Sequence, residues 1–235
     1  MKKIIAMVPA RIGSKRVPKK NLRLIDGKPL IGYILETLKK VTVLDEIYLN
    51  ADDVIFGKIA KDYGVKFYHR DKQFSTDKST NDEFALDFME NVEGDILLQI
   101  LPTSPLITVK EIEEFTQNMI EKDLETLISV EHKQIACLYE NKTLNFDKYK
   151  KNPPSQEMEP VKAYATVLMG WENNSFKENM NKYGCAYHGG DSKTDYYELK
   201  GLSTIDIDNE EDFLLAEAII TALKNQTKKE IKFYE

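Results

Sequence analysis

The chain has 235 residues and a net charge of −6 at pH 7, from 33 Lys and Arg against 39 Asp and Glu. Its length fits one large domain, or a core domain with an inserted subdomain, and its acidic balance disfavours a nucleic-acid-binding protein. No apolar run reaches the ~20 residues of a membrane span, so no membrane partner is expected. Cys137 and Cys185 are too few for a disulfide framework and lack metal-type spacing, which favours a cytoplasmic protein.

Predicted strands and helices alternate along residues 1–131. In chain order we expect a strand at Lys3–Val8, a helix behind Pro29, a strand at Ile47–Leu49, a helix at Val54–Tyr63, a strand at Val65–Tyr68, a helix at Asn81–Asn91, a strand at Asp95–Leu101, a helix capped by Thr108 and a strand at Glu125–Val130. This order predicts an α/β fold with a Rossmann-like, mostly parallel sheet and helices on both faces.

The regular alternation breaks after Glu131. Residues 132–160 are polar, contain three prolines and show weak periodicity, so we interpret them as an inserted dimerisation element, lid or β-arm. The core is expected to resume over 161–225, with a strand at Ala163–Met169, an ordered loop at Tyr183–Leu202 and a helix capped by Asn209. Residues 226–235 are predicted to form a tail.

A basic segment, Pro9–Asn21 (PARIGSKRVPKKN), follows the first predicted strand. In a parallel α/β sheet, ligands bind at the carboxyl ends of the strands. Gly13 allows close backbone approach, and Arg11, Lys15 and Lys20 can neutralise a triphosphate. The segment matches neither the Walker A pattern nor the dinucleotide pattern G-x-G-x-x-G, so P-loop kinases and Rossmann dehydrogenases are disfavoured. The simpler interpretation is a solvated basic loop.

A pair of carboxylates, Asp206 and Asp208, lies near the end of the chain. Alternating apolar and acidic residues at Ile205–Asp208 predict a short strand that places both carboxylates on one side. Mg²⁺ prefers one or two carboxylates together with substrate phosphates, so the pair is a candidate magnesium site. The alternative is an exposed strand end that leads into the helix capped by Asn209.

The basic segment resembles the signature of the acylneuraminate cytidylyltransferases, the CMP-sialic acid synthetase family (PAR-x-GSK-x-x-x-KN). The resemblance covers about Lys2–Ala222. It includes Gly27-Lys28-Pro29-Leu30, Arg70 with Asp77, Pro102-Thr103-Ser104-Pro105-Leu106, and Asp206-Ile207-Asp208 with Asp212-Phe213. The related Kdo cytidylyltransferases use a similar loop, but here Lys15 follows Ser14 directly and Lys20-Asn21 replaces their Gly-Lys.

This resemblance implies a homodimeric enzyme that uses CTP to activate an acidic nine-carbon sugar for bacterial surface or flagellin glycosylation. It implies catalytic roles for Arg11, Lys15, Lys20 and Asp208, and a Mg²⁺ site at Asp206 and Asp208. The implied nucleotide contacts are Ala10, Arg11, Gly13, Ser14, Lys15, Lys20, Asn21, Arg70, Ser79, Thr80 and Asn81. For Ser79, Thr80 and Asn81, ordinary loop and helix-capping roles stay open.

The sugar-binding part departs from the family pattern Leu-Gln-Pro-Thr-Ser-Pro-Leu-Arg. Leu101 stands where the family has Gln, and Ile107 replaces the Arg. A less polar pocket favours a doubly acylaminated sugar, with legionaminic acid expected first and pseudaminic acid second. Candidate substrate contacts are Gln99, Leu101, Thr103, Ser104, Lys133, Lys162, Tyr164 and Tyr197, together with Tyr187 and Tyr196. Packing roles for the tyrosines stay open, as do a Kdo-type or other sugar nucleotidyltransferase and a non-catalytic nucleotide-binding protein.

Overall fold

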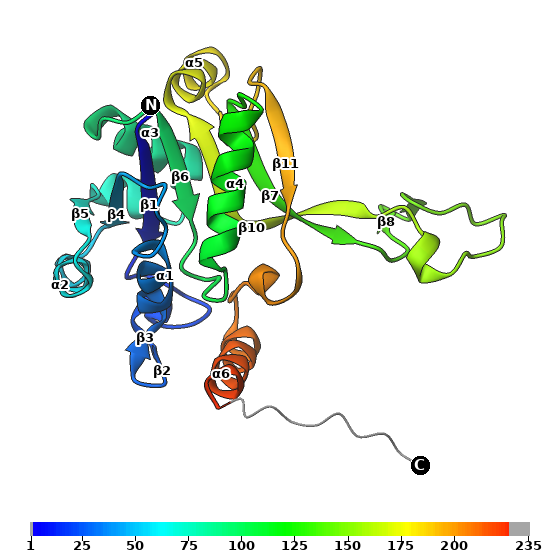
Figure 1. Ribbon diagram of the computed structural model, residues 1–235, viewed down its shortest axis with the longest axis horizontal. Helices are drawn as coiled ribbons and strands as arrows, with labels where there is room; N and C mark the ends of the chain where they lie inside the picture. Colours follow the sequence, from blue (N-terminus) through cyan, green and yellow to red (C-terminus); the bar gives the residue numbers. More distant parts are fainter. Residues whose placement is uncertain (1, 226–235) are drawn as a thin grey trace.

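A seven-stranded sheet forms the centre of the computed structural model, which describes residues 2–225 (Figure 1). The strands are β1 (Ile4–Ala10), β4 (Glu46–Ala51), β5 (Lys66–His69), β6 (Ile96–Ile100), β7 (Thr126–Lys133), β10 (Val161–Glu172) and β11 (Thr194–Glu198). Their order is β11-β7-β10-β6-β1-β4-β5, and only β10 is antiparallel to its neighbours. The predicted Rossmann-like, mostly parallel sheet is confirmed.

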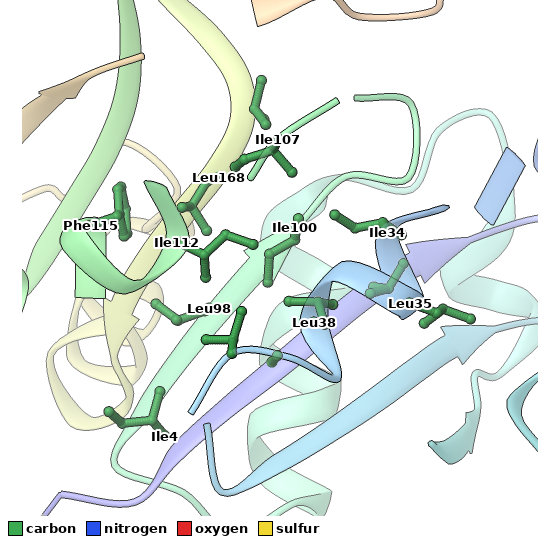
Figure 2. Packing of buried hydrophobic residues seen from close by; sticks show 14 of the residues in the cluster. Ile4, Ile34, Leu35, Leu38, Leu98, Ile100, Ile107, Ile112, Phe115 and Leu168 are labelled. Atoms are coloured by element: carbon green, nitrogen blue, oxygen red, sulfur yellow. The ribbon is translucent and has the colours of Figure 1, made fainter. Parts of the chain in front are cut away.

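Helices cover both faces of this sheet. They are α1 (Leu30–Leu38), α2 (Val54–Tyr63), α3 (Asn81–Asn91), α4 (Val109–Glu121) and α5 (Asn173–Tyr183). A further helix, α6 (Glu210–Lys224), packs in a separate apolar cluster that contains no residue of this sheet. One core cluster joins α1, α2 and α4 to the sheet, and a second joins α3 and α5 to its other face. Figure 2 shows α1 and α4 meeting over Leu98 and Ile100 of β6. Burial of such apolar surface is the main stabilising contribution to the fold.

Helix starts follow the local sequence signals. Thr80, Thr108 and Asn209 each cap a helix in a capping box, with Glu83, Glu111 and Asp212 as the third helical residues. An N-cap of this kind contributes about 1 kcal/mol because it satisfies a backbone N–H that has no partner within the helix. The predicted caps at Thr108 and Asn209 are therefore confirmed.

Strand β10 is longer than predicted and contains a β-bulge in its pairing with β7. Its pairing register with β7 shifts between Tyr164 and Met169, and Thr166 adopts a left-handed φ of 53°. The Val167 carbonyl then accepts a hydrogen bond from Leu101 N, at 3.0 Å, just beyond the end of β6. The bulge thus fixes where the 101–107 loop leaves the sheet.

Two sequence predictions near the carboxyl end of the chain were wrong. The segment predicted as a loop at Tyr183–Leu202 contains β11, which pairs in parallel with β7 at the sheet edge. The segment Ile205–Asp208 is not a strand, because Ile207 N bonds only to the Thr103 carbonyl and no strand lies alongside. The predicted alternation survives in part, since Ile207 is fully buried while Asp206 and Asp208 are not.

Residues 134–160 project from the sheet as an arm (Figure 1). The arm carries a short hairpin of β8 (Leu138–Tyr139) and β9 (Lys142–Thr143) and a 3-10 turn at Ser155–Glu157. The arm starts two residues after the start of the predicted insertion, 132–160, and ends at the same residue. The predicted tail at 226–235 lies outside the described residues. Among residues 2–225, no helix is both long and apolar enough to cross a bilayer.

A substitution at Gly170 in β10 would test how closely the sheet packs against α4. A Cβ on Gly170 would lie 2.8 Å from Met119 Sδ, 3.0 Å from Leu98 Cδ2 and 3.2 Å from Phe115 Cε1. We expect Gly170→Ala to lower the free energy of unfolding by about 1–3 kcal/mol, since added volume strains a close-packed core. Urea unfolding measures this. Gly13→Ala, whose Cβ meets nothing within 4 Å, is the control, and equal midpoints for both variants would contradict the prediction.

Candidate functional site

A cavity of about 390 Å³ opens at the carboxyl ends of β1 and β6. Its walls come from the loop after β1, the start of α3, the loop after β6 and the segment before α6. These parts are far apart in sequence, and the parallel sheet brings them to one edge. This is the edge where open α/β sheets bind ligands.

The cavity lining includes a buried guanidinium. Arg70 is 4% exposed and donates hydrogen bonds to the carbonyls of Ala10 and Asn50, and its Nε has no partner. The group also lies over the Phe84 ring, 4.6 Å from the ring centroid. Burial lowers the pKa of Arg70 to about 10, so it stays charged at neutral pH. This part of the cavity lining is therefore positively charged.

The basic loop is anchored by one apolar side chain. Val17 is fully buried with Ile25, Leu30, Ile207 and Phe213 in a cluster separate from the two main cores. This cluster holds the loop after β1 against the segment before α6. Packing alone thus brings the two motifs, the basic loop and the carboxylate pair, to the same place.

The cations of the loop are paired with acids at the cavity mouth. Arg11 contacts Asp77 at 3.1 Å, and Lys15 forms a second ion pair with the same carboxylate, which lowers the pKa of Asp77. Arg16 donates to Asp208 at 2.7 Å. These pairs are exposed, so each contributes little stability, and a stronger anion can displace them.

Lys20 lies between the loop and the carboxylate pair. Its Nζ donates to the Ile207 carbonyl and lies 3.9 Å from Asp208 Oδ1, and its side chain is 12% exposed. Burial lowers the pKa of Lys20, and the nearby Asp206 and Asp208 oppose that shift. Burial also raises the pKa of Asp206, and Asp206 Oδ1 is buried without a hydrogen-bond partner.

The carboxylate pair fits a hard divalent cation. Residues 2–225 hold no group of three or more His, Cys, Asp or Glu that could bind a metal by themselves. Mg²⁺ does not need such a group, because it is commonly held by one or two carboxylates and substrate phosphates. Asp206 and Asp208 supply those two carboxylates: Asp206 Oδ1 has no hydrogen-bond partner, and Asp208 lines the cavity.

Many of the residues proposed from the sequence line this cavity. They are Ala10, Arg11, Ser14, Lys15, Lys20, Asn21, Arg70, Asn81, Leu101, Thr103 and Asp208. Gly13 lies in the same loop, and Asp206 lies next to Lys20. Arg16, Phe84 and Pro102 also line the cavity but were not proposed. Phe84 could have been found from its helical spacing of three residues from Asn81.

Other proposed residues have local roles outside the cavity lining. Thr80 caps α3, and Ser79 Oγ donates to the Gln73 carbonyl. Gln99 and Ser104 are buried. Lys133 pairs with Glu131.

Tyr197 needs correction as a candidate substrate contact. Its ring packs on Phe115 in an edge-to-face arrangement, and its hydroxyl donates to Glu114, so it faces α4. The packing role left open for this tyrosine is the one the structure shows. Ile107 is likewise a core residue, at 2% exposure, and does not line the cavity.

Tyr164 and Lys162 belong to a separate surface that we call the aromatic shelf: Tyr164, His188 and Tyr196, with Lys162 beside them. The Tyr164 ring lies 5.5 Å from His188 and 6.2 Å from Tyr196, and Lys162 Nζ lies 5.7 Å from the Tyr196 centroid. The segment before His188 is tied to α3 by Asp82, which accepts hydrogen bonds from the backbone N–H groups of residues 186 and 187. The shelf is thereby linked to the helix turn that carries Asn81.

Comparison with known proteins agrees with this geometry. A family model described as cytidylyltransferase matches residues 5–182. The chain belongs to the cytidylyltransferase family. This match spans the basic loop, α3 and the loop after β6, but ends before the carboxylate pair.

Individual relatives carry related names. The chain is 28% identical over 254 aligned residues to an N-acylneuraminate cytidylyltransferase of Escherichia coli O18:K1:H7, with 99% of this chain and 55% of that protein covered. It is 34% identical over 127 residues to a pseudaminic acid cytidylyltransferase of Campylobacter jejuni, covering 49% and 54%. The chain thus spans about half the length of these curated relatives.

Solved structures share the fold. A CMP-2-keto-3-deoxy-manno-octonic acid synthetase complexed with CTP superposes with a TM-score of 0.72 at 18% identity, covering 94% of this chain and 99% of that one. A cytidylyltransferase from Leptospira borgpetersenii gives a TM-score of 0.66 at 15% identity, covering 98% and 100%.

Proposed function

We propose that this cytidylyltransferase-family chain transfers CMP from CTP to the anomeric hydroxyl of an acidic 2-keto nine-carbon sugar. The hydroxyl oxygen forms a bond to the α-phosphorus, the bond from that phosphorus to the bridging oxygen breaks, and pyrophosphate leaves with the electron pair. The hydroxyl proton passes to solvent. The observation that carries this proposal is one cavity whose lining includes three cations, Arg11, Lys15 and Lys20, together with the carboxylate of Asp208.

The loop cations suit the charge of the leaving group. Arg11 and Lys15 share the single exposed carboxylate of Asp77, and they can exchange it for a triphosphate that carries more negative charge. Nucleotidyl transfer depends on positioning and on stabilising charge that develops in the transition state. In this proposal Arg11, Lys15 and Lys20 hold the β- and γ-phosphates, and Ser14 adds a hydroxyl donor.

Asp206 and Asp208 would hold the magnesium ion implied by the family. Mg²⁺ bound there supplies charge neutralisation for the phosphates. The chain itself contributes Lys20, whose ammonium group offsets the repulsion between the two carboxylates.

The nucleotide and the sugar occupy opposite sides of the reacting phosphate in this proposal. Arg70, Asn81 and Phe84 form the wall for the base, and Asn21 supplies a buried side-chain oxygen that has no partner. The sugar extends from Leu101 and Thr103 toward the aromatic shelf. A shelf of rings suits acylamino groups, since aromatic faces bury apolar surface beside polar tips.

We infer a doubly acylaminated sugar from this apolar lining, with legionaminic acid first and pseudaminic acid second. The test is pyrophosphate release from CTP with each of four sugars: legionaminic acid, pseudaminic acid, N-acetylneuraminic acid and Kdo. We expect kcat/KM to be at least about tenfold higher for the better of legionaminic and pseudaminic acid than for N-acetylneuraminic acid or Kdo. A difference of this size is expected when a substrate loses one set of polar contacts with the pocket. Consumption of Kdo alone would favour the Kdo-type alternative, and CTP binding with no turnover would favour a non-catalytic role.

We also propose a homodimer formed through the arm. Ile135, Leu138 and Tyr139 are exposed by about 60% in the chain, and Leu144 and Tyr149 add to this apolar surface. Exposed apolar groups in such a cluster mark interaction sites. Cys137 and Cys185 form no disulfide with each other, which suits the cytoplasm as the proposed location.

Leu138→Glu tests the dimer. We expect the variant to sediment as a monomer at concentrations where the unmodified chain sediments as a dimer, because a charge is buried without a partner at the interface. Leu215→Glu on α6 is the control, since Leu215 is 54% exposed and Leu138 60%. Loss of the dimer in the control only would move the interface to α6.

A further inference from the structure

Gln99 is a carboxamide in an apolar part of the sheet. It lies in β6, opposite Met7 of β1 and Met169 of β10, and it is 0% exposed. Its Nε2 donates a hydrogen bond to Asn81 Oδ1 at 3.2 Å, and its own Oε1 has no partner. A buried polar atom without a hydrogen bond costs free energy, so this glutamine is not placed there for stability.

Its one contact controls how Asn81 faces the cavity. Asn81 is the first residue of α3 and lines the cavity, whereas Gln99 does not. Because Asn81 Oδ1 is engaged by Gln99, the amide group Nδ2 is the end left for a ligand, and no described residue in 2–225 accepts a hydrogen bond from it. An amide has one donor end and one acceptor end, so fixing the oxygen also fixes what the side chain offers.

The backbone that carries Asn81 is itself held in place. Thr80 and Glu83 form a capping box around it, and Asp82 binds the 186–187 backbone. The amide orientation is therefore the remaining variable, and Gln99 sets it.

The neighbouring wall points to the same ligand chemistry. Arg70 lies on that wall with a charged guanidinium, whose Nη2 donates to the carbonyls of Ala10 and Asn50. Arg70 therefore contributes positive charge to the wall, and Asn81 Nδ2 contributes an N–H donor. Such a wall favours acceptor atoms and disfavours N–H groups.

We propose that Gln99 is a positioning residue that sets the base preference of the cavity, by turning Asn81 Nδ2 toward an acceptor edge of the pyrimidine. Cytosine offers an acceptor at N3, where uracil carries an N–H, so a donor directed at position 3 selects cytosine over uracil. This inference rests on the proposed function, in which a pyrimidine nucleotide occupies the cavity.

The decisive variant is Gln99→Met, which has similar length and two methionine neighbours. We expect the ratio of the Kd for UTP to the Kd for CTP, measured by calorimetry with Mg²⁺ and no sugar, to fall about tenfold, the effect of one hydrogen bond that is no longer directed. The unfolding midpoint stays equal or rises, because an unpartnered oxygen leaves the apolar face. An unchanged ratio in a folded Gln99→Met variant overturns the inference.

A double-mutant cycle shows whether Gln99 acts through Asn81. Asn81→Ala alone should lower the ratio, and adding Gln99→Met should then change it no further. If Gln99→Met lowers this Kd ratio in the Asn81→Ala background as much as it does alone, Gln99 acts by another route, and the inference is overturned. A ratio that rises in Gln99→Met places the Asn81 oxygen at the cavity and also overturns it. If the unmodified chain binds neither nucleotide, the proposed function fails instead, so the two failures are distinguishable.

Discussion

Asp208→Asn is expected to lower kcat/KM for CMP transfer by about 10³-fold, the size of effect that accompanies loss of a metal-binding or charge-stabilising group at a transition state. Asparagine keeps the volume of the side chain but removes its charge. Asp208 lines the cavity, accepts from Arg16 at 2.7 Å and lies 3.9 Å from Lys20 Nζ. With Asp206 it forms the pair of carboxylates proposed to hold Mg²⁺.

Two measurements check this prediction. Pyrophosphate release gives kcat/KM, and paramagnetic resonance of Mn²⁺ in the presence of CTP reports metal binding without turnover. Glu210→Gln is the matched control. Glu210 lies two residues after Asp208 in the sequence, pairs with Arg23 at 2.6 Å and does not line the cavity. The control should keep its activity within about twofold, as expected for an exposed ion pair. Activity in Asp208→Asn equal to that of the control would contradict the metal assignment.

The parts of the fold that the sequence predicted correctly depend on local signals. A short, β-branched apolar run predicted the strand at Lys3–Val8, which the structure has as β1, and cap residues predicted the starts of α4 and α6. The sequence did not show β11, since Thr194–Glu198 is short, polar and paired on one side only. Ile205–Asp208 shows the converse error: the alternating pattern was present, but no strand is available to pair with it.

The cavity could be predicted where a motif is contiguous in sequence. The basic loop is such a motif, and its position after β1 follows from the parallel sheet. The link between Gln99 and Asn81 joins β6 to α3 across 18 positions, and no local pattern indicates it. Tyr197 and Tyr164 were both proposed as substrate contacts, yet they face opposite sides of the sheet because β11 and β10 set their direction.

One small cluster explains why the distant motifs meet. Val17 belongs to the basic loop, Ile207 separates the two carboxylates, and Phe213 belongs to α6, and all three are fully buried together. The apolar residue between Asp206 and Asp208 therefore orients both acids. Their function as a pair depends on a core contact as much as on their own chemistry.

Lys20→Met is expected to weaken CTP binding about 30-fold and to lower kcat/KM by about 10²–10³-fold, because hydrogen bonds and ion pairs to phosphates are charge-assisted and strengthen in the transition state. Two loop cations approach Asp208, and Lys20 is the more buried of them, with its side chain 12% exposed against 67% for Arg16. Methionine matches its length without the charge. The two carboxylates then lose their nearest buried counter-charge, so Mg²⁺ binding in the absence of CTP should tighten while CTP binding weakens.

That opposite change in the two affinities distinguishes this role from simple misfolding, which weakens both. Calorimetry with Mg²⁺ alone and with CTP in excess Mg²⁺ measures them separately. Lys19→Met is the control, because Lys19 is exposed, adjacent in sequence and absent from the cavity lining. Its CTP affinity should stay within about twofold, the effect of a distant screened charge. If Lys20→Met binds CTP as the control does, Lys20 does not hold the triphosphate, and only Arg11 and Lys15 remain as the proposed cations for it.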